Sequence, residues 1–330
     1  MGTLPLATPA ALAVTRTQDP ADERLMLWPD RPPGAPDRLP EVRIEQKSQD
    51  PAVPVRWLSG IDRPWLSVRR PARPNGAAVI VMPGGGYGFL SWDREGEEQA
   101  RWLTDRGMTV FILAYRLPGE SWRDRAHVPL ADAQRAIRRV RGAAGRFGID
   151  PGRVAVLGFS AGGHLAASLA TRHDEPVYRP VDAQDRLSAR PDAAGLIYPV
   201  VSMAASFTHK GSRDALLGEA ASRVDRLAAS IETRVTESTP PCFLVHAADD
   251  RVVPIANSLA LYERLLAAGR PAEFHGYDKG GHGFALRLPD ALPASRWPDL
   301  FAAFLERWIG ALPAGRYAAG RAPPQTRDRA

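Results

Sequence analysis

The fold of this chain is decided at Gly158-Phe159-Ser160-Ala161-Gly162, which joins two segments of different character. The β-branched run over 154–157 predicts a buried strand before it, and the small, apolar run over 161–171 predicts a helix after it. A serine on so sharp a turn needs glycines two positions before and after, because side chains there would clash with the strand and helix. We therefore predict Ser160 as a nucleophile at a helix N-terminus, whose dipole favours negative charge. The alternative is a serine that only shapes the turn.

Strand-like and helix-like runs alternate on both sides of this turn. The further expected strands are 77–82, 109–114, 194–198, 242–246 and 272–277, and the further helices are 94–106, 130–144, 255–268 and 298–312. Such alternation implies right-handed crossovers and a mostly parallel sheet with helices on both faces. The predicted fold class is therefore α/β.

Three segments depart from the alternation and set the expected domain organisation. Residues 1–40 are rich in Pro, Asp and Arg and predict an irregular N-terminal extension. Residues 41–312 are expected to form a single domain, which opens with β-like runs at 42–45 and 65–68. Within it, residues 199–240 carry weak helical signals and no strand, which predicts an insertion over the strand ends near the active site. Residues 313–330 are expected to be a flexible tail.

A serine nucleophile needs a base, and the base needs an acid that orients it. Only His275 and His282 follow the last strand signals, and His275 lies inside a strand. His282 lies in the loop Gly280-Gly281-His282-Gly283, free to reach the sheet edge, and is the predicted base. The acid should follow the preceding strand, where two carboxylates are adjacent. We predict Asp249 as the triad acid and Asp250 as a loop-structuring or capping acid.

Backbone N–H groups are needed to stabilise an oxyanion. Ala161, the residue after the nucleophile, should supply one, and Gly85 or Gly86 in the loop Pro83-Gly-Gly-Gly-Tyr87 should supply the other. Glycine lets the backbone approach a substrate without a Cβ. The competing interpretation, a phosphate-binding loop, is disfavoured because no Gly-Lys-Ser/Thr follows.

Bulky residues near the nucleophile predict a short acyl pocket. Tyr87 directly follows the glycine loop, Phe159 precedes the nucleophile, and His209 is a polar residue of the insertion. We predict that these three contact the substrate and that acetyl esters are preferred, because overpacking a closed pocket is unfavourable. The sequence has no His-Glu-x-x-His helix or comparable ligand cluster, so no metal and no cofactor are expected.

Composition excludes several other classes of protein. The 330 residues are 44% hydrophobic and 24% charged, an ordinary globular mixture without an apolar run long enough to span a membrane. One cysteine, Cys242, excludes an intrachain disulfide framework and a cysteine zinc cluster. The net charge of +6 does not predict nucleic-acid binding, because the arginines are spread among acids and the tail, with four arginines and one aspartate, carries +3 of it.

The first residues carry no sign of a targeting segment. The start, Met1-Gly-Thr-Leu-Pro-Leu-Ala-Thr-Pro9, has neither a basic region nor an apolar region of the kind found in signal peptides. A cytoplasmic location is therefore expected, or a periplasmic or secreted one if a signal peptide has already been removed.

Taken together, several segments resemble the α/β-hydrolase superfamily over about residues 50–312. Within it, they are similar to the bacterial acetyl-esterase group that includes acetylxylan-esterase-like and other carbohydrate esterases. The matching segments are 27–29, 83–87, 95–96, 115–118, 132–136, 158–164, 198–199, 246–254 and 281–283. The resemblance implies hydrolysis of esters, commonly acetyl groups on sugars, through a Ser-Asp-His triad and an acyl-enzyme. One departure is Pro83, where related esterases often carry His, but the backbone donors survive that change.

Two alternatives to the esterase remain open from the sequence. One is a serine peptidase resembling the catalytic domain of prolyl oligopeptidases, but that family usually carries a large accessory domain, which 40 irregular residues cannot supply. The other is a non-catalytic binding protein on the same fold. The presence of all three residue types of a triad argues against it.

Overall fold

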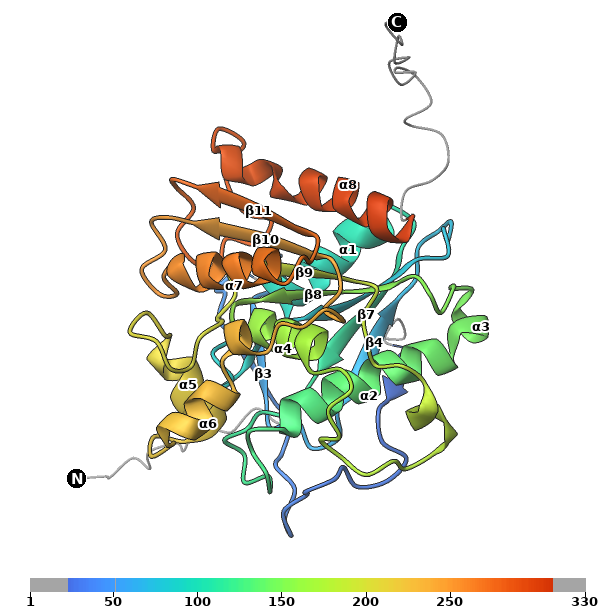
Figure 1. The fold of residues 1–330 in the computed structure, drawn as a ribbon. Coiled ribbons are helices and arrows are strands. Elements are labelled where there is room, and N and C mark those ends of the chain that lie inside the picture. The colour runs from blue at the N-terminus through green and yellow to red at the C-terminus, as the bar shows by residue number, and fades with distance from the viewer. Residues whose placement is uncertain (1–22, 51, 311–330) are drawn as a thin grey trace, which may run out of the picture.

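The centre of the computed structural model, which describes residues 23–50 and 52–310, is an eight-stranded sheet (Figure 1). Its order is β1-β4-β7-β5-β8-β9-β10-β11. The strands are β1 (Arg24–Met26), β4 (Trp65–Arg69), β5 (Ala78–Met82), β7 (Thr109–Ala114), β8 (Val154–Phe159), β9 (Ala193–Ile197), β10 (Cys242–Ala247) and β11 (Ala272–Tyr277). From β7 to β11 all neighbouring strands pair in parallel, whereas β4 is antiparallel to β7 and to β1. The predicted α/β architecture is confirmed.

The central strands are apolar because both faces of the sheet are covered. Every residue of β5, β7, β8, β9 and β10 is buried. One face carries α1 (Glu98–Thr104) and α8 (Trp297–Ile309), which meet where the rings of Trp102 and Trp297 lie 6.5 Å apart. The other carries α2 (Val128–Gly142), α4 (Ser160–Thr171) and α7 (Ala256–Ala267) (Figure 1). Covered faces explain why these strands read as continuous apolar runs in the sequence.

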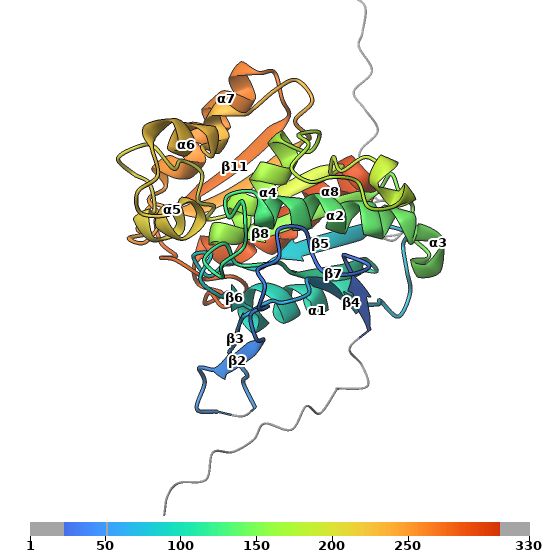
Figure 2. The same ribbon diagram turned by 90° about the horizontal axis from the view of Figure 1, so that it is seen from below.

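The segment 199–240 interrupts the alternation as expected. It contains α5 (Lys210–Leu217), α6 (Arg223–Ala228) and the 3₁₀ turn η3 (Ile231–Thr233), and no strand. Helices α5 and α6 contact each other at one end of the molecule (Figure 2). The remaining short helices are α3 (Ala144–Phe147), η2 (Ala183–Arg186) and η4 (Pro293–Arg296).

A second, small sheet was not fully foreseen. It consists of β2 (Arg43–Gln46), β3 (Arg56–Ser59) and β6 (Leu90–Ser91), all antiparallel. Figure 2 shows the β2–β3 hairpin projecting from the body of the molecule beside β6. The π-helical turn η1 (Asp93–Glu97) follows β6 and continues into α1. Strand β6 thus connects this hairpin to the loop that carries the glycines 84–86.

The prediction of an irregular extension over residues 1–40 is wrong for its described part. Strand β1 pairs with β4, and Leu27 and Trp28 are buried. Polar groups of α2 hold this segment: Asp132 accepts the Trp28 indole N–H at 2.8 Å, and Arg135 donates to the Leu27 carbonyl at 2.8 Å. These contacts join positions more than 100 residues apart, so no local pattern announces them. Residues 1–22 and the predicted tail, 313–330, lie outside the described residues.

Two general features bear on what the molecule can bind. Within residues 23–50 and 52–310, no helix combines the length and apolar character that crossing a bilayer requires. In the same ranges, no group of three or more His, Cys, Asp or Glu side chains is arranged to hold a metal ion.

Candidate active site

Ser160 occupies a strained turn between β8 and α4. Its φ is +51°, a left-handed conformation that non-glycine residues rarely adopt. A Cβ on Gly158 would lie 2.2 Å from the Gly162 carbonyl oxygen, and one on Gly162 would lie 2.1 Å from the Met82 carbonyl oxygen. Any side chain at these two positions would clash with backbone atoms, so both must be glycine, as their spacing around Ser160 predicts. The turn leaves the Ser160 side chain at the wall of a cavity.

His282 contacts both Ser160 and Asp250. Its Nε2 lies 3.0 Å from Ser160 Oγ, and its Nδ1 lies 2.6 Å from Asp250 Oδ2. A carboxylate only accepts, so Nδ1–H donates to Asp250 and Nε2 is left to accept the Ser160 hydroxyl proton. The three side chains form a continuous chain that can remove a proton from Ser160.

The prediction of Asp249 as the triad acid is wrong, because Asp250 takes that position. Asp249 Oδ1 instead accepts the Gly281 N–H at 2.8 Å and so holds the loop that carries His282. The chain turns directly after β10, with the Asp250 N–H donating to the Ala247 carbonyl at 3.2 Å. Both acids contact the same loop, and only the geometry of this turn decides which one meets the imidazole.

Asp250 is held as a carboxylate by its surroundings. Burial alone would raise the pKa of Asp250, but hydrogen bonds with His246 and His282 outweigh burial and hold that pKa well below its ordinary value. Its Oδ1 accepts the backbone N–H groups of Val252 and Val253, both at 2.9 Å. The loop-structuring role predicted for Asp250 is thus also present, in the same side chain.

The glycine loop exposes backbone donors beside Ser160. Gly85 and Gly86 line the cavity with φ of +124° and +63°. Within the part of the chain that the structure describes, their N–H groups have no protein acceptor. A Cβ on Gly85 would lie 2.1 Å from the Phe89 carbonyl oxygen, so this position requires glycine. Ala161 lies in the first turn of α4, next to Ser160. Gly85 and Gly86 therefore line the same cavity as Ser160, and Ala161 adjoins Ser160 in the chain.

The cavity at Ser160 measures about 560 Å³ and has one wall that sequence reasoning missed. That wall comes from the β2–β3 hairpin. Trp57 of β3 stacks on Phe89 with ring centroids 3.8 Å apart, and the Lys47 ammonium lies 4.4 Å from the centroid of the indole ring. The remaining lining residues include Val53, Val55, Ser91, Arg94, Glu95, Val252 and Arg287. The exposed, polar β2 carries no signal that it approaches a site.

Two of the three predicted substrate contacts are wrong. The Tyr87 ring is buried, and its hydroxyl lies 2.8 Å from Nδ1 of His164, a buried histidine. Phe159 is fully buried and packs against the rings of Tyr198 and Trp297. Neither side chain lines the cavity: Phe159, the last residue of β8, and Tyr87, in the loop after β5, are both packed into the core. His209 does line the cavity.

His209 is held in one tautomer by the start of α5. Its Nδ1 accepts the Ser212 N–H at 3.2 Å and lies 2.8 Å from Ser212 Oγ. Burial lowers the pKa of His209, and the neighbouring His282 lowers it further, so the ring is neutral near pH 7. A neutral imidazole that accepts at Nδ1 carries its hydrogen on Nε2. His209, which lines the cavity, therefore carries a hydrogen-bond donor at Nε2.

The chain is similar to a family model and to several known proteins. The BD-FAE family model matches residues 68–265. An acetylxylan esterase of Xylanibacter ruminicola is 32% identical over 74% of this chain and 47% of its own length. Endo-1,4-beta-xylanase B of Butyrivibrio fibrisolvens is 34% identical over 63% of this chain and 32% of its own length. The chain thus spans less than half the length of either relative.

Solved structures share the whole fold. An acetyl ester-xyloside bifunctional hydrolase from Caldicellulosiruptor lactoaceticus is 35% identical with a TM-score of 0.72, and the match covers 90% of this chain and 100% of that one. Esterase 2 of Thermogutta terrifontis, solved with propionate bound, is 25% identical with a TM-score of 0.63 over 85% of this chain and 98% of that one. The α/β-hydrolase fold predicted from the sequence is confirmed.

Proposed function

The chain belongs to the BD-FAE family of α/β-hydrolases, and from that premise we propose that it is a serine esterase for short-chain acyl esters, above all acetyl esters of carbohydrates. One observation carries the proposal: Ser160, His282 and Asp250 are hydrogen-bonded in series at the wall of a cavity. The glycines of the neighbouring loop place free backbone donors at the same wall. A binding protein would have no use for this arrangement.

The reaction follows from the placement of these groups. Ser160 Oγ attacks the ester carbonyl while His282 Nε2 takes the hydroxyl proton, and the carbonyl oxygen becomes an oxyanion that accepts from the backbone N–H groups of Ala161 and of Gly85 or Gly86. His282 then gives the proton to the departing alcohol, which leaves an acyl-enzyme. Water attacks the acyl-enzyme in the same way and releases the acid and Ser160. Asp250 keeps the imidazole in its tautomer and stabilises it when protonated.

The names of the relatives support an acetyl ester of a sugar as the substrate. Those named above include an acetylxylan esterase and an acetyl ester-xyloside hydrolase, and a further relative from Pseudomonas putida is an ethyl acetate hydrolase, 37% identical over 38% of this chain. The sugar portion of the ester would lie along the wall formed by Trp57 and His209, which offers an aromatic edge and a hydrogen-bond donor.

The proposal is tested by the rates on a panel of esters. We expect kcat/KM of purified protein to be highest for nitrophenyl acetate, lower for the butyrate and negligible for the octanoate. Acetylated xylo-oligosaccharides should release acetate, and peptide nitroanilides should not react. A buried methylene gains about 0.8 kcal/mol, so an open groove would reverse the order. A steady rise from acetate to octanoate would contradict the acetyl preference and favour a lipase-like enzyme.

His209 provides a separate test of the sugar. We expect its Nε2–H to donate to an oxygen of the alcohol portion of the substrate, a hydrogen bond of about 0.5–1.5 kcal/mol. His209→Ala should raise KM for an acetylated xylo-oligosaccharide by roughly 2- to 13-fold, from the same range of energies. Steady-state kinetics on nitrophenyl acetate, which lacks sugar hydroxyls, should change little.

The matched control is His127→Ala, which removes a histidine that pairs with Asp124 and does not line the cavity. An equal effect of His209→Ala on both substrates would contradict a contact with the sugar.

A further inference from the structure

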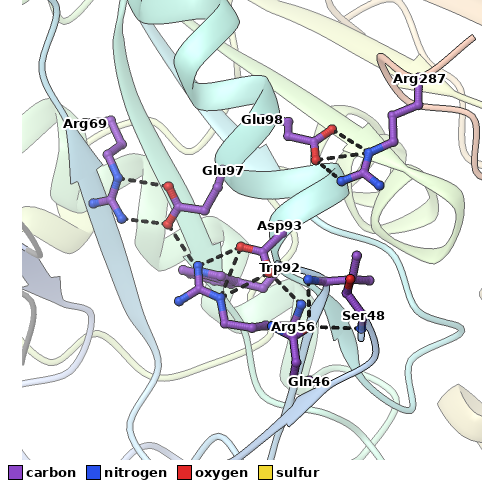
Figure 3. A network of polar contacts seen from close by, with 10 residues as sticks. Gln46, Ser48, Arg56, Arg69, Trp92, Asp93, Glu97, Glu98 and Arg287 are labelled. Carbon is purple, nitrogen blue, oxygen red and sulfur yellow. Dashed lines mark hydrogen bonds and ion pairs between the residues drawn. The ribbon is translucent and has the colours of Figure 1, made fainter. Parts of the chain in front are cut away.

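Glu95 differs from the other acids of the segment 93–98. Asp93 pairs with Arg56 at 2.6 Å, Glu97 pairs with Arg69 at 2.6 Å, and Glu98 pairs with Arg287, as Figure 3 shows. Within residues 23–50 and 52–310, Glu95 has no such ion pair, yet it is only 5% exposed. The reaction described above does not use this buried carboxyl group, although it lines the same cavity as Ser160.

The π-helical turn η1 directs Glu95 inward while its acidic neighbours pair with surface arginines. Turns of this kind often occur at functional sites. One carboxylate oxygen of Glu95 accepts the Gly84 N–H at 2.8 Å, and the other accepts the Tyr198 hydroxyl at 2.9 Å. Burial raises the pKa of Glu95, and the hydrogen bonds from Tyr198 and Gly84 oppose that rise. Glu95 therefore accepts one hydrogen bond from each of two loops.

The first of these loops carries the predicted oxyanion donors. Gly84 immediately precedes Gly85 and Gly86, and it is enclosed on both sides. A Cβ on Gly84 would lie 2.8 Å from Glu95 Oε2 and 2.9 Å from Ser160 Cβ. The Gly84 residue thus lies between the Glu95 carboxylate and Ser160, and its hydrogen bond to Glu95 holds it in place.

The second contact leads to the loop of His282. Tyr198 follows β9, and its ring centroid lies 5.0 Å from that of His282. The Tyr198 hydroxyl donates to Glu95 and accepts the Ala285 N–H at 3.2 Å, three residues beyond His282. One carboxylate is therefore linked to the glycine loop on one side and to the base on the other.

Backbone strain is concentrated in the segments that this carboxylate joins. Tyr87, Ser160, Tyr198 and Ala285 all have positive φ, between +39° and +64°. Non-glycine residues keep such conformations only where the surrounding structure determines them. Glu95 is hydrogen-bonded to the loop of Gly84 and, through Tyr198, to the loop of His282. The site keeps its shape only if the strained backbone conformations in these segments are maintained.

We propose that Glu95 is a positioning residue that holds the oxyanion loop, through Gly84, and the His282 loop, through Tyr198, in the arrangement required for catalysis. The inference rests on the proposed esterase function. Removing one oxyanion donor lowers kcat by roughly 10²–10³-fold in a serine protease. Because Glu95 acts at one step removed, we expect a loss of about 10- to 100-fold in kcat for Glu95→Ala, with KM changed less than about threefold.

The experiment compares kcat, KM and melting temperature of Glu95→Ala, Glu95→Gln and Tyr198→Phe on nitrophenyl acetate. Glu95→Gln preserves the shape but cannot accept from both partners, so it should lose less kcat than Glu95→Ala. Because Glu95 and Tyr198 share one hydrogen bond, the losses of kcat in Glu95→Gln and Tyr198→Phe should combine to less than their product in the double variant. Glu97→Gln is the matched control: it breaks the ion pair with Arg69 and should keep the wild-type kcat.

Two results would overturn the inference. One is a kcat within twofold of wild type in both Glu95 variants. The other is a loss of kcat that Glu97→Gln reproduces at the same loss of melting temperature, which would make Glu95 merely structural. If Glu95→Ala does not fold, Glu95→Gln and the double variant decide. A wild-type protein without esterase activity would instead refute the proposed function, so the two failures are distinguishable.

Discussion

Ser160→Ala should abolish turnover of nitrophenyl acetate while the protein stays folded. The Ser160 hydroxyl lies 3.0 Å from His282 Nε2, and alanine removes only that oxygen. We expect kcat to fall by roughly 10³–10⁶-fold, with the remaining rate due to the oxyanion donors and substrate binding. Steady-state kinetics measures the loss, and the melting temperature and circular dichroism show that the fold is retained.

Ser168→Ala is the control for this substitution. Ser168 lies two turns further along α4, is buried and does not line the cavity. It should keep the wild-type kcat. A fluorophosphonate probe should label the wild type and Ser168→Ala but not Ser160→Ala. Near-wild-type turnover by folded Ser160→Ala would end the assignment of Ser160 as nucleophile.

Asp250→Asn should lower kcat by about 10⁴-fold, because the amide would select the wrong tautomer of His282. The structure supplies the reason. Oδ1 of Asp250 accepts two backbone N–H groups, so the oxygen of an asparagine must stay there and its NH₂ must face His282 Nδ1. An imidazole that accepts at Nδ1 carries its hydrogen on Nε2 and cannot accept the Ser160 proton.

Asp249→Asn is the matched control at the neighbouring residue, and we expect it to have a small effect on kcat. Its side-chain oxygen can still accept the Gly281 N–H, so kcat should stay within about threefold, since only a neutral hydrogen bond replaces a charged one. Kinetics of the two variants on one substrate, with melting temperatures, gives the ranking. A larger loss of kcat in Asp249→Asn than in Asp250→Asn would return the triad role to Asp249.

The sequence by itself determined the architecture and two members of the triad. The apolar run 109–114 became a strand with those same bounds, because a strand covered on both faces must be apolar along its length. Segment 272–277 also became a strand with its predicted bounds, although it lies at the edge of the sheet and none of its residues is fully buried. Gly158 and Gly162 identified the turn at Ser160, because the clashes they avoid involve backbone within a few residues or in the adjacent strand. His282 followed from its position after the last strand. Each of these signals is local.

Only the tertiary structure decided which neighbouring groups face the site. Asp249 and Asp250 are chemically identical and adjacent, and a single turn after β10 sends one to Nδ1 of His282 and the other to the Gly281 N–H. Tyr87 follows the glycine loop, yet its ring turns into the core toward His164. A residue next to a motif is close to it along the chain, but the backbone dihedral angles decide in which direction its side chain points.

The role inferred for Glu95 depends on the tertiary structure most of all. Glu95 and Tyr198 are 103 positions apart, and their hydrogen bond forms only because η1 and the end of β9 meet beneath the same cavity. The hairpin wall at Trp57 arises in the same way, from the pairing of β3 with β6. Periodicity and glycine spacing report constraints within one turn or strand, whereas these contacts follow from how separate segments pack together, and so the folded chain alone determines them.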